Sequence, residues 1–122
     1  MSDQEFKGNS PKSPSGESIF FNSLDYWIEL CECIRMIIAD SFPSYPSMEA
    51  EDAEFLADLL ERRLEFGLVR AYFELAARRR FNDPDISEEE IEAEVGDHVE
   101  TMLDWAGQYI VFLRECGGCE PV

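Results

Sequence analysis

The sequence predicts an all-α protein, a small helical bundle of three to four helices with a buried first helix and a disordered N-terminal leader. Apolar residues recur every three or four positions along most of the chain. No alternation of apolar and polar residues longer than four positions indicates a strand. The 122 residues, 45% of them hydrophobic, suffice for one domain with a core. We expect a leader over 1–18, the bundle over 19–115 and a flexible Cys/Gly tail over 116–122.

The expected leader is rich in Ser, Gly, Pro and Asn and has no apolar periodicity, which is typical of disorder. The N-terminus lacks the basic start and apolar run of a signal peptide. No run of 18 apolar residues predicts a transmembrane helix. The sequence therefore predicts a cytoplasmic protein that does not contact membranes.

The first helix is expected over residues 19–41. Its apolar residues occupy most of the circumference, so we expect it to be the central, buried helix. Pro43 and Pro46 then end it, because proline removes a backbone donor and disfavours helix in the preceding residue. The two apolar stripes are Phe20, Leu24, Trp27, Cys31, Ile34 and Ile38, and Tyr26, Leu30, Cys33 and Ile37.

Helical periodicity continues over residues 47–81. Ser47 is the expected N-cap, and the segment ends at Arg78–Arg80, where cations suit the helix dipole. Gly67 lies in the middle and costs about 1 kcal/mol in a helix interior. The sequence leaves open whether this segment is one helix or two.

The last helix has the clearest start signal in the chain. Ser87 and Glu90 fit a capping box, and Ile86 with Ile91 fits a hydrophobic staple. Apolar residues then recur at helical spacing as far as Leu113. The sequence predicts a long amphipathic helix that starts just after Ser87.

The formal net charge is −17, and all but one unit of it belongs to residues 19–122. The carboxylates gather in two segments, whereas the arginines cluster separately in the sequence, around Arg62 and around Arg78–Arg80. Such a field argues against nucleic acid as a direct ligand, because nucleic-acid binding begins with neutralising phosphates. The residues expected to contact a partner are Glu49, Glu51, Asp52, Glu54, Asp58 and Glu61 in the first segment, and Asp85, Glu88, Glu89, Glu90, Glu92 and Glu94 in the second.

These charges predict a non-enzymatic binding module that docks on a basic surface of a partner protein, for example a nucleic-acid-binding one. An inhibitor, an immunity-type protein or a nucleic-acid mimic would fit. The alternative is a structural or adaptor subunit that binds through apolar helix faces, such as a patch around Phe66, Tyr72 and Phe73. The acids could instead serve solubility alone, and a homo-oligomer is left open.

Enzymatic and cofactor chemistry finds little support in the sequence. His98, the only histidine, lies on an apolar stripe and is expected to be a core-edge residue bonded to a carboxylate. The side chains of Cys31 and Cys33 point about 200° apart around a helix, so we expect them to be core residues rather than metal ligands. For Cys116 and Cys119, a disulfide or metal binding is left open. Residues 83–94 resemble a calcium loop but lack its glycine, so no metal, cofactor or catalytic residue is expected.

Overall fold

The computed structural model describes residues 4–21, 24–38, 42 and 44–122. Within these ranges the chain is mostly helical, but it also contains a small antiparallel sheet, so the all-α prediction is wrong. A short 3-10 helix, η1 (Pro14–Gly16), lies between the first two strands. The helices are α1 (Leu24–Ile38), α2 (Ala50–Glu65), α3 (Leu68–Arg80) and α4 (Glu88–Glu115); the strands are β1 (Gln4–Gly8), β2 (Ser18–Phe21) and β3 (Cys119–Pro121).

The sheet has the strand order β2-β1-β3, with β1 antiparallel to both neighbours. Phe6 of β1 lies opposite Ile19 of β2 on one side and opposite Pro121 of β3 on the other. The region expected to be a disordered leader therefore contains the central strand, and the expected flexible tail contains an edge strand. Each strand is too short to produce a recognisable alternation, and β1 finds one of its partners at the far end of the chain.

Helix α1 is shorter than the expected helix over 19–41. Ile19 and Phe20 belong to β2, and residues 39–41 lie outside the described residues. The expectation of a buried helix holds for one face, where Trp27, Leu30 and Ile34 are buried. The opposite face is exposed at Met36, among other residues.

The segment after α1 forms two helices. Gly67 separates α2 from α3 with φ of 80°, in the left-handed region that glycine adopts without steric cost. The expected N-cap at Ser47 is wrong: Glu49 holds the extended cap position and makes no side-chain cap bond. Ser47 instead donates its N–H to Ser44 in a turn.

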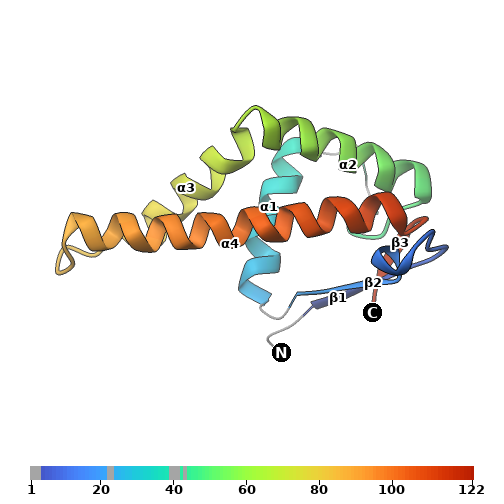
Figure 1. Cartoon of the computed structure of the whole chain (residues 1–122), viewed down its shortest axis with the longest axis horizontal. Helices are drawn as coiled ribbons and strands as arrows, with labels where there is room; N and C mark the ends of the chain where they lie inside the picture. Colours follow the sequence, from blue (N-terminus) through green and yellow to red (C-terminus); the bar gives the residue numbers. More distant parts are fainter. Residues whose placement is uncertain (1–3, 22–23, 39–41, 43) are drawn as a thin grey trace.

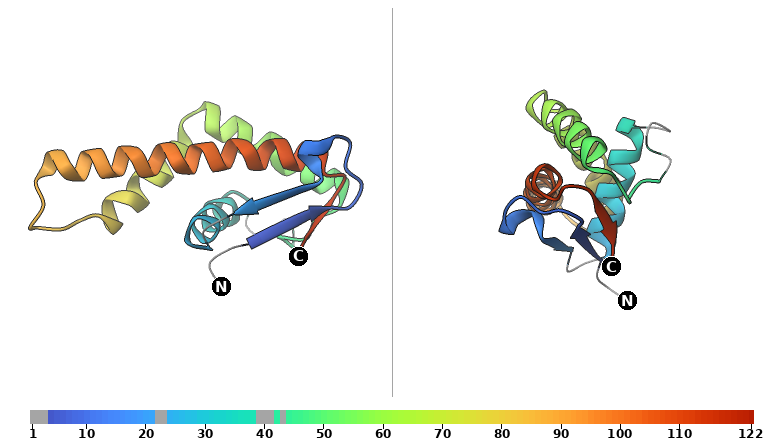
Figure 2. Two further views of the ribbon diagram at one scale, coloured as in Figure 1. Left: turned by 60° about the horizontal axis from the view of Figure 1, so that its bottom comes forward. Right: turned by 90° about the vertical axis from the view of Figure 1, so that its right-hand side faces the viewer.

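Helix α4 begins where the sequence predicted. Ser87 is its N-cap, and its Oγ accepts a hydrogen bond from the Glu90 N–H at 3.3 Å. The helix runs the length of the molecule, with α2 and α3 above it and the sheet below its C-terminal half (Figure 1). The right-hand view of Figure 2 shows α2 on one side of α4 and the sheet on the other, with α1 alongside them.

The core joins all of these elements around a group of aromatic rings. Trp27 of α1 lies with its ring centroid 4.6 Å from that of Phe6, 5.0 Å from that of Phe21 and 5.8 Å from that of Tyr109. The Tyr109 hydroxyl is 3.1 Å from the Tyr45 hydroxyl, which satisfies both buried groups. Burial raises the pKa of both tyrosines well above the usual value.

Candidate functional site

The first predicted acidic segment lies along the outer side of α2, whose inner side buries Leu56 and Leu60. Three of its six acids are in ion pairs that the sequence did not reveal. Lys12 Nζ lies 2.5 Å from Glu54 Oε1. Arg114 of α4 lies between Asp58, at 3.1 Å, and Glu61. Among the described residues, no ion pair engages the remaining three, Glu49, Glu51 and Asp52.

The second predicted segment forms the last turn before α4 and the first two turns of that helix, and all six of its acids are exposed. Glu92 is bound by both guanidinium nitrogens of Arg78, one of them at 3.0 Å. The hydrogen bond from Arg78 lowers the pKa of the Glu92 carboxyl. No described cation forms an ion pair with the other five, Asp85, Glu88, Glu89, Glu90 and Glu94.

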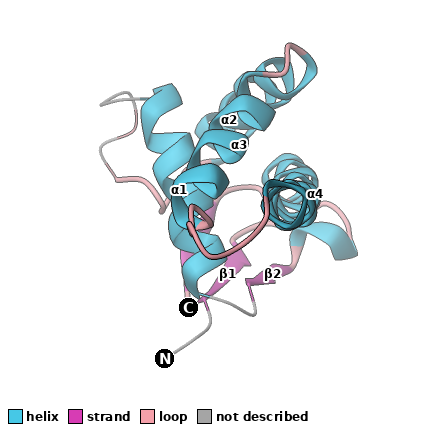
Figure 3. Cartoon of the chain, turned by 90° about the vertical axis from the view of Figure 1, so that its left-hand side faces the viewer, coloured by secondary structure: helices cyan, strands magenta, loops and turns pink. Residues whose placement is uncertain are grey.

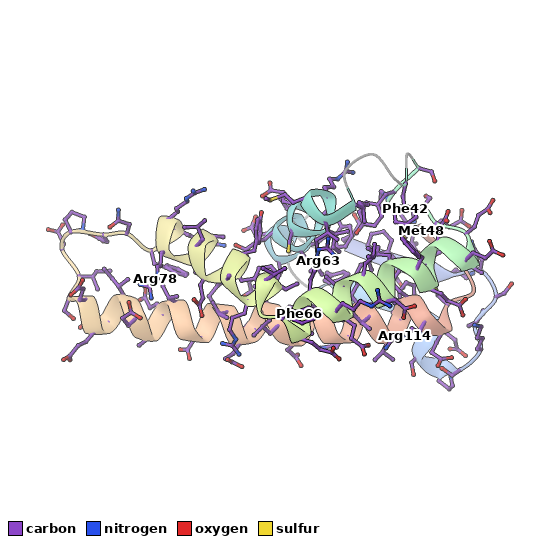
Figure 4. All side chains as sticks on the ribbon, turned by 90° about the horizontal axis from the view of Figure 1, so that it is seen from above. Phe42, Met48, Arg63, Phe66, Arg78 and Arg114 are labelled. Carbon is purple, nitrogen blue, oxygen red and sulfur yellow. The ribbon has the colours of Figure 1, made fainter. Side chains whose placement is uncertain are left out.

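The structure does not join the two segments into one surface. The start of α2 lies at the sheet end of the molecule, and the start of α4 lies at the opposite end of the long axis (Figure 1). There α3 and α4 extend beyond the sheet as an arm, which we call the α3–α4 arm, residues 76–94. The arginines are not set apart either, because α3 runs antiparallel to α4 and places Arg78 beside Glu92 and Arg70 3.2 Å from Glu100. Figure 4 shows Arg78 on this arm and Arg114 near the other end.

His98 is buried, as expected, and its partner is a carboxylate. That carboxylate belongs to Glu29 of α1, with Oε2 2.6 Å from His98 Nε2. The rings of Tyr26 and Phe81 lie edge-on to the imidazole at centroid distances of 6.1 and 5.7 Å. Within the described part of the chain, no nucleophilic side chain forms a hydrogen bond with His98. The pair therefore connects α1 to α4 inside an aromatic surround and has the features of a structural contact.

The four cysteines are free thiols. Cys33 is buried, as expected of a core residue, and burial raises its pKa to about 12. Cys116 and Cys119 are also buried, and a hydrogen bond between the two thiols lowers the pKa of Cys116 and raises that of Cys119. No group of three metal-ligating side chains occurs in the described ranges. The calcium-like segment is a turn followed by a helix, in which Asp83 Oδ1 accepts the Asp85 N–H at 2.9 Å.

The apolar patch that the alternative function, an adaptor subunit, would use is only partly exposed. Phe66 is 80% exposed, Tyr72 is half-buried and Phe73 is fully buried. A shallow pocket of about 190 Å³ lies beside it between α1 and α3, and Met36, at 72% exposure, and Leu68 form part of its wall. Apolar surface is thus available at the junction of α2 and α3, but not as the continuous patch that the spacing suggested.

Comparison of the chain with models of protein families, with curated protein sequences and with solved structures found no match to any of them. No helix in the described part of the chain is long and apolar enough to cross a membrane. The inference of function therefore depends on the surfaces described above.

Proposed function

We propose that this protein is a non-enzymatic binding module whose α3–α4 arm docks on a basic surface of a partner protein. One observation supports this: five exposed carboxylates at the start of α4 have no ion pair with a described cation, although three arginines end the neighbouring helix. Of these three arginines, Arg78 is the one that forms an ion pair with a described carboxylate, and that carboxylate is Glu92. Repulsion between unpaired like charges destabilises a fold, and a cationic partner relieves it.

The arm has a shape suited to docking, because it extends past the sheet and exposes the start of α4 on several sides (Figure 1). Opposite fields would make association fast and sensitive to salt, since the Debye length falls to about 8 Å at physiological ionic strength. The acids at the start of α2 lie too far away to contact the same compact surface, so they are a second, separate negative surface.

The proposal is tested by capture at low salt on immobilised protein from an extract of the source cells, elution with salt and measurement of the affinity of the eluted partner. An arm variant neutralises four carboxylates of the predicted contact. A matched control neutralises four acids outside both segments. The arm variant is E88Q, E89Q, E90Q and E94Q; the control is D25N, E32Q, E65Q and E74Q.

We expect a basic partner whose affinity falls at least about tenfold in the arm variant and changes little in the control, because each lost surface contact with a cation contributes up to about 1 kcal/mol. Capture that withstands high salt, equal losses in both variants, or no captured basic protein would each contradict the proposal. Salt-resistant capture that M36D abolishes would instead favour docking at the apolar pocket between α1 and α3.

A further inference from the structure

A groove of about 290 Å³ runs between strand β2 and the C-terminal half of α4. Both Figure 2 and Figure 3 place β2 beside α4, with β1 on its other side. The floor and walls are apolar or neutral, and Val111 on the helix wall is 48% exposed. The lining residues are Ser15, Ser18, Ile19, Gln108, Val111 and Phe112.

The groove lies along the free edge of β2, with which no described strand pairs. At the other edge of the sheet, Met48 pairs with Cys119 of β3 through two backbone hydrogen bonds of 2.8 Å. No such cover protects β2: within the described ranges, backbone and side-chain hydrogen bonds from outside the sheet do not reach Ser18 or Phe20.

The register shows which main-chain groups face outward. Gly8 N–H donates to Glu17 C=O at 2.9 Å, so Gly8 and Glu17 form a hydrogen-bonded pair. In an antiparallel ladder such pairs alternate, which makes Phe6 and Ile19 the next one. Ser18 and Phe20 therefore direct their N–H and C=O groups away from β1, toward the open edge.

We propose that an extended, cationic segment of a partner protein adds to β2 as a fourth strand and inserts apolar side chains into this groove. An open strand edge beside a helix is the arrangement by which strand addition binds peptides: main-chain hydrogen bonds supply affinity, and the adjoining pocket supplies specificity.

Charge selects this occupant. No charged residue lines the groove. The spacing along β2 and α4 places carboxylates just beyond its lining: Glu17 precedes β2, and on α4 Asp104 lies one turn before Gln108 and Glu115 one turn after Val111. An apolar segment flanked by Lys or Arg meets all of these groups favourably. A second copy of this chain would bring its own negative charge to the same edge, which opposes self-pairing. The inference does not depend on the α3–α4 arm, which lies at the other end of α4.

The experiment uses the full chain and a labelled peptide, Lys-Lys-Val-Thr-Val-Thr-Lys-Lys, measured by fluorescence anisotropy. F20P removes one outward N–H and leaves the ladder with β1 intact, because proline is tolerated on edge strands at such positions. F20A is the matched control, since it removes the ring and keeps the N–H. V111R fills the groove, and L75R adds the same charge on α3, outside the groove.

We expect the peptide to bind the wild type, F20A and L75R with similar affinity. F20P and V111R should each bind at least about tenfold more weakly, since a hydrogen-bonding group left unpaired costs on the order of 1–3 kcal/mol. A peptide N-methylated at alternate positions should fail to bind the wild type, which tests the main-chain contact even if F20P does not fold. An acidic peptide of the same apolar pattern should not bind.

Equal binding of F20P and F20A, unchanged binding of the N-methylated peptide, or no binding of the first peptide would overturn the proposal. A dimer seen by sedimentation that F20P dissociates would also overturn it, because the edge would then pair with a second copy. An arm variant that loses affinity for the captured basic partner but binds the labelled peptide like the wild type would show that the two proposals concern separate sites.

Discussion

The contact between His98 and Glu29 should make a large contribution to stability, because it is the polar side-chain contact that joins α1 to α4 in the described residues. The two side chains are 7% and 14% exposed, so solvent screens them little. A carboxylate only accepts hydrogen bonds, and its removal from water is costly unless it stays paired. The magnitude of the loss therefore depends on which partner is removed.

H98L would leave the Glu29 carboxylate buried without its donor, and such single removals cost about 3–5 kcal/mol. E29L removes one hydrogen-bond partner of the imidazole, at a cost of about 1–3 kcal/mol. The double variant should cost less than the sum, because replacing both members of a buried pair with apolar side chains is often close to neutral. The two single costs sum to about 4–8 kcal/mol, so we expect a coupling energy of at least about 3 kcal/mol, a large fraction of the total stability of a typical small domain.

The assay is urea unfolding followed by fluorescence of Trp27 and Trp105, which lie in and beside the core. The four proteins of the double-mutant cycle are measured at one pH, and their free energies of unfolding are compared provided that their m-values agree. A cost below 1 kcal/mol for H98L, or a double variant whose cost equals the sum of the single ones, would refute the reasoning.

Two further expectations concern the backbone and the thiols. G16A should lower the free energy of unfolding by about 1–3 kcal/mol and unfold at a clearly lower urea concentration, because its Cβ would lie 2.0 Å from the Glu115 carbonyl oxygen. The control G96A should gain about 1 kcal/mol, because nothing lies within 4 Å of the added Cβ and alanine suits a helix interior. At pH 8, iodoacetamide should leave Cys33 of the native protein unmodified, since its pKa of about 12 keeps the reactive thiolate scarce, and should modify it in urea; mass spectrometry reports the site. Modification of native Cys33 at the rate seen in urea would contradict the second expectation. A G16A variant that unfolds at the same urea concentration as the wild type would contradict the first.

The features that could be predicted from the sequence depend on residues that lie close together in the chain. The Ser87 cap formed because its hydroxyl needs only the N–H three residues on. The choice between one helix and two at Gly67 was left open by the sequence; the structure has two, because the φ of Gly67 is accessible to glycine at little cost. The buried state of His98 followed from its place on an apolar stripe.

The features that were missed depend on segments distant in sequence. The strands of the sheet hold few residues each, and β1 acquires its second strand partner only when β3 arrives from a distant part of the chain. The partner of His98 proved to be Glu29 on another helix, where neighbouring acids of its own helix were equally plausible from sequence. The ion pairs of Arg114 and Lys12 with α2 likewise cross between elements, so no spacing rule could find them.

The place of β1 at the centre of the sheet has a consequence for synthesis on the ribosome. β1 and β2 can pair once residues 4–21 are made, but the other edge of β1 stays unpaired until Cys119–Pro121 are made. Polypeptide chains are synthesised at about 5–20 residues per second, so the free edge of β1 stays open for several seconds or more. An unpaired strand edge is a template for wrong partners. The nascent chain therefore carries an open strand edge from the synthesis of β1 until that of β3, and slower translation between the two strands would lengthen that exposure.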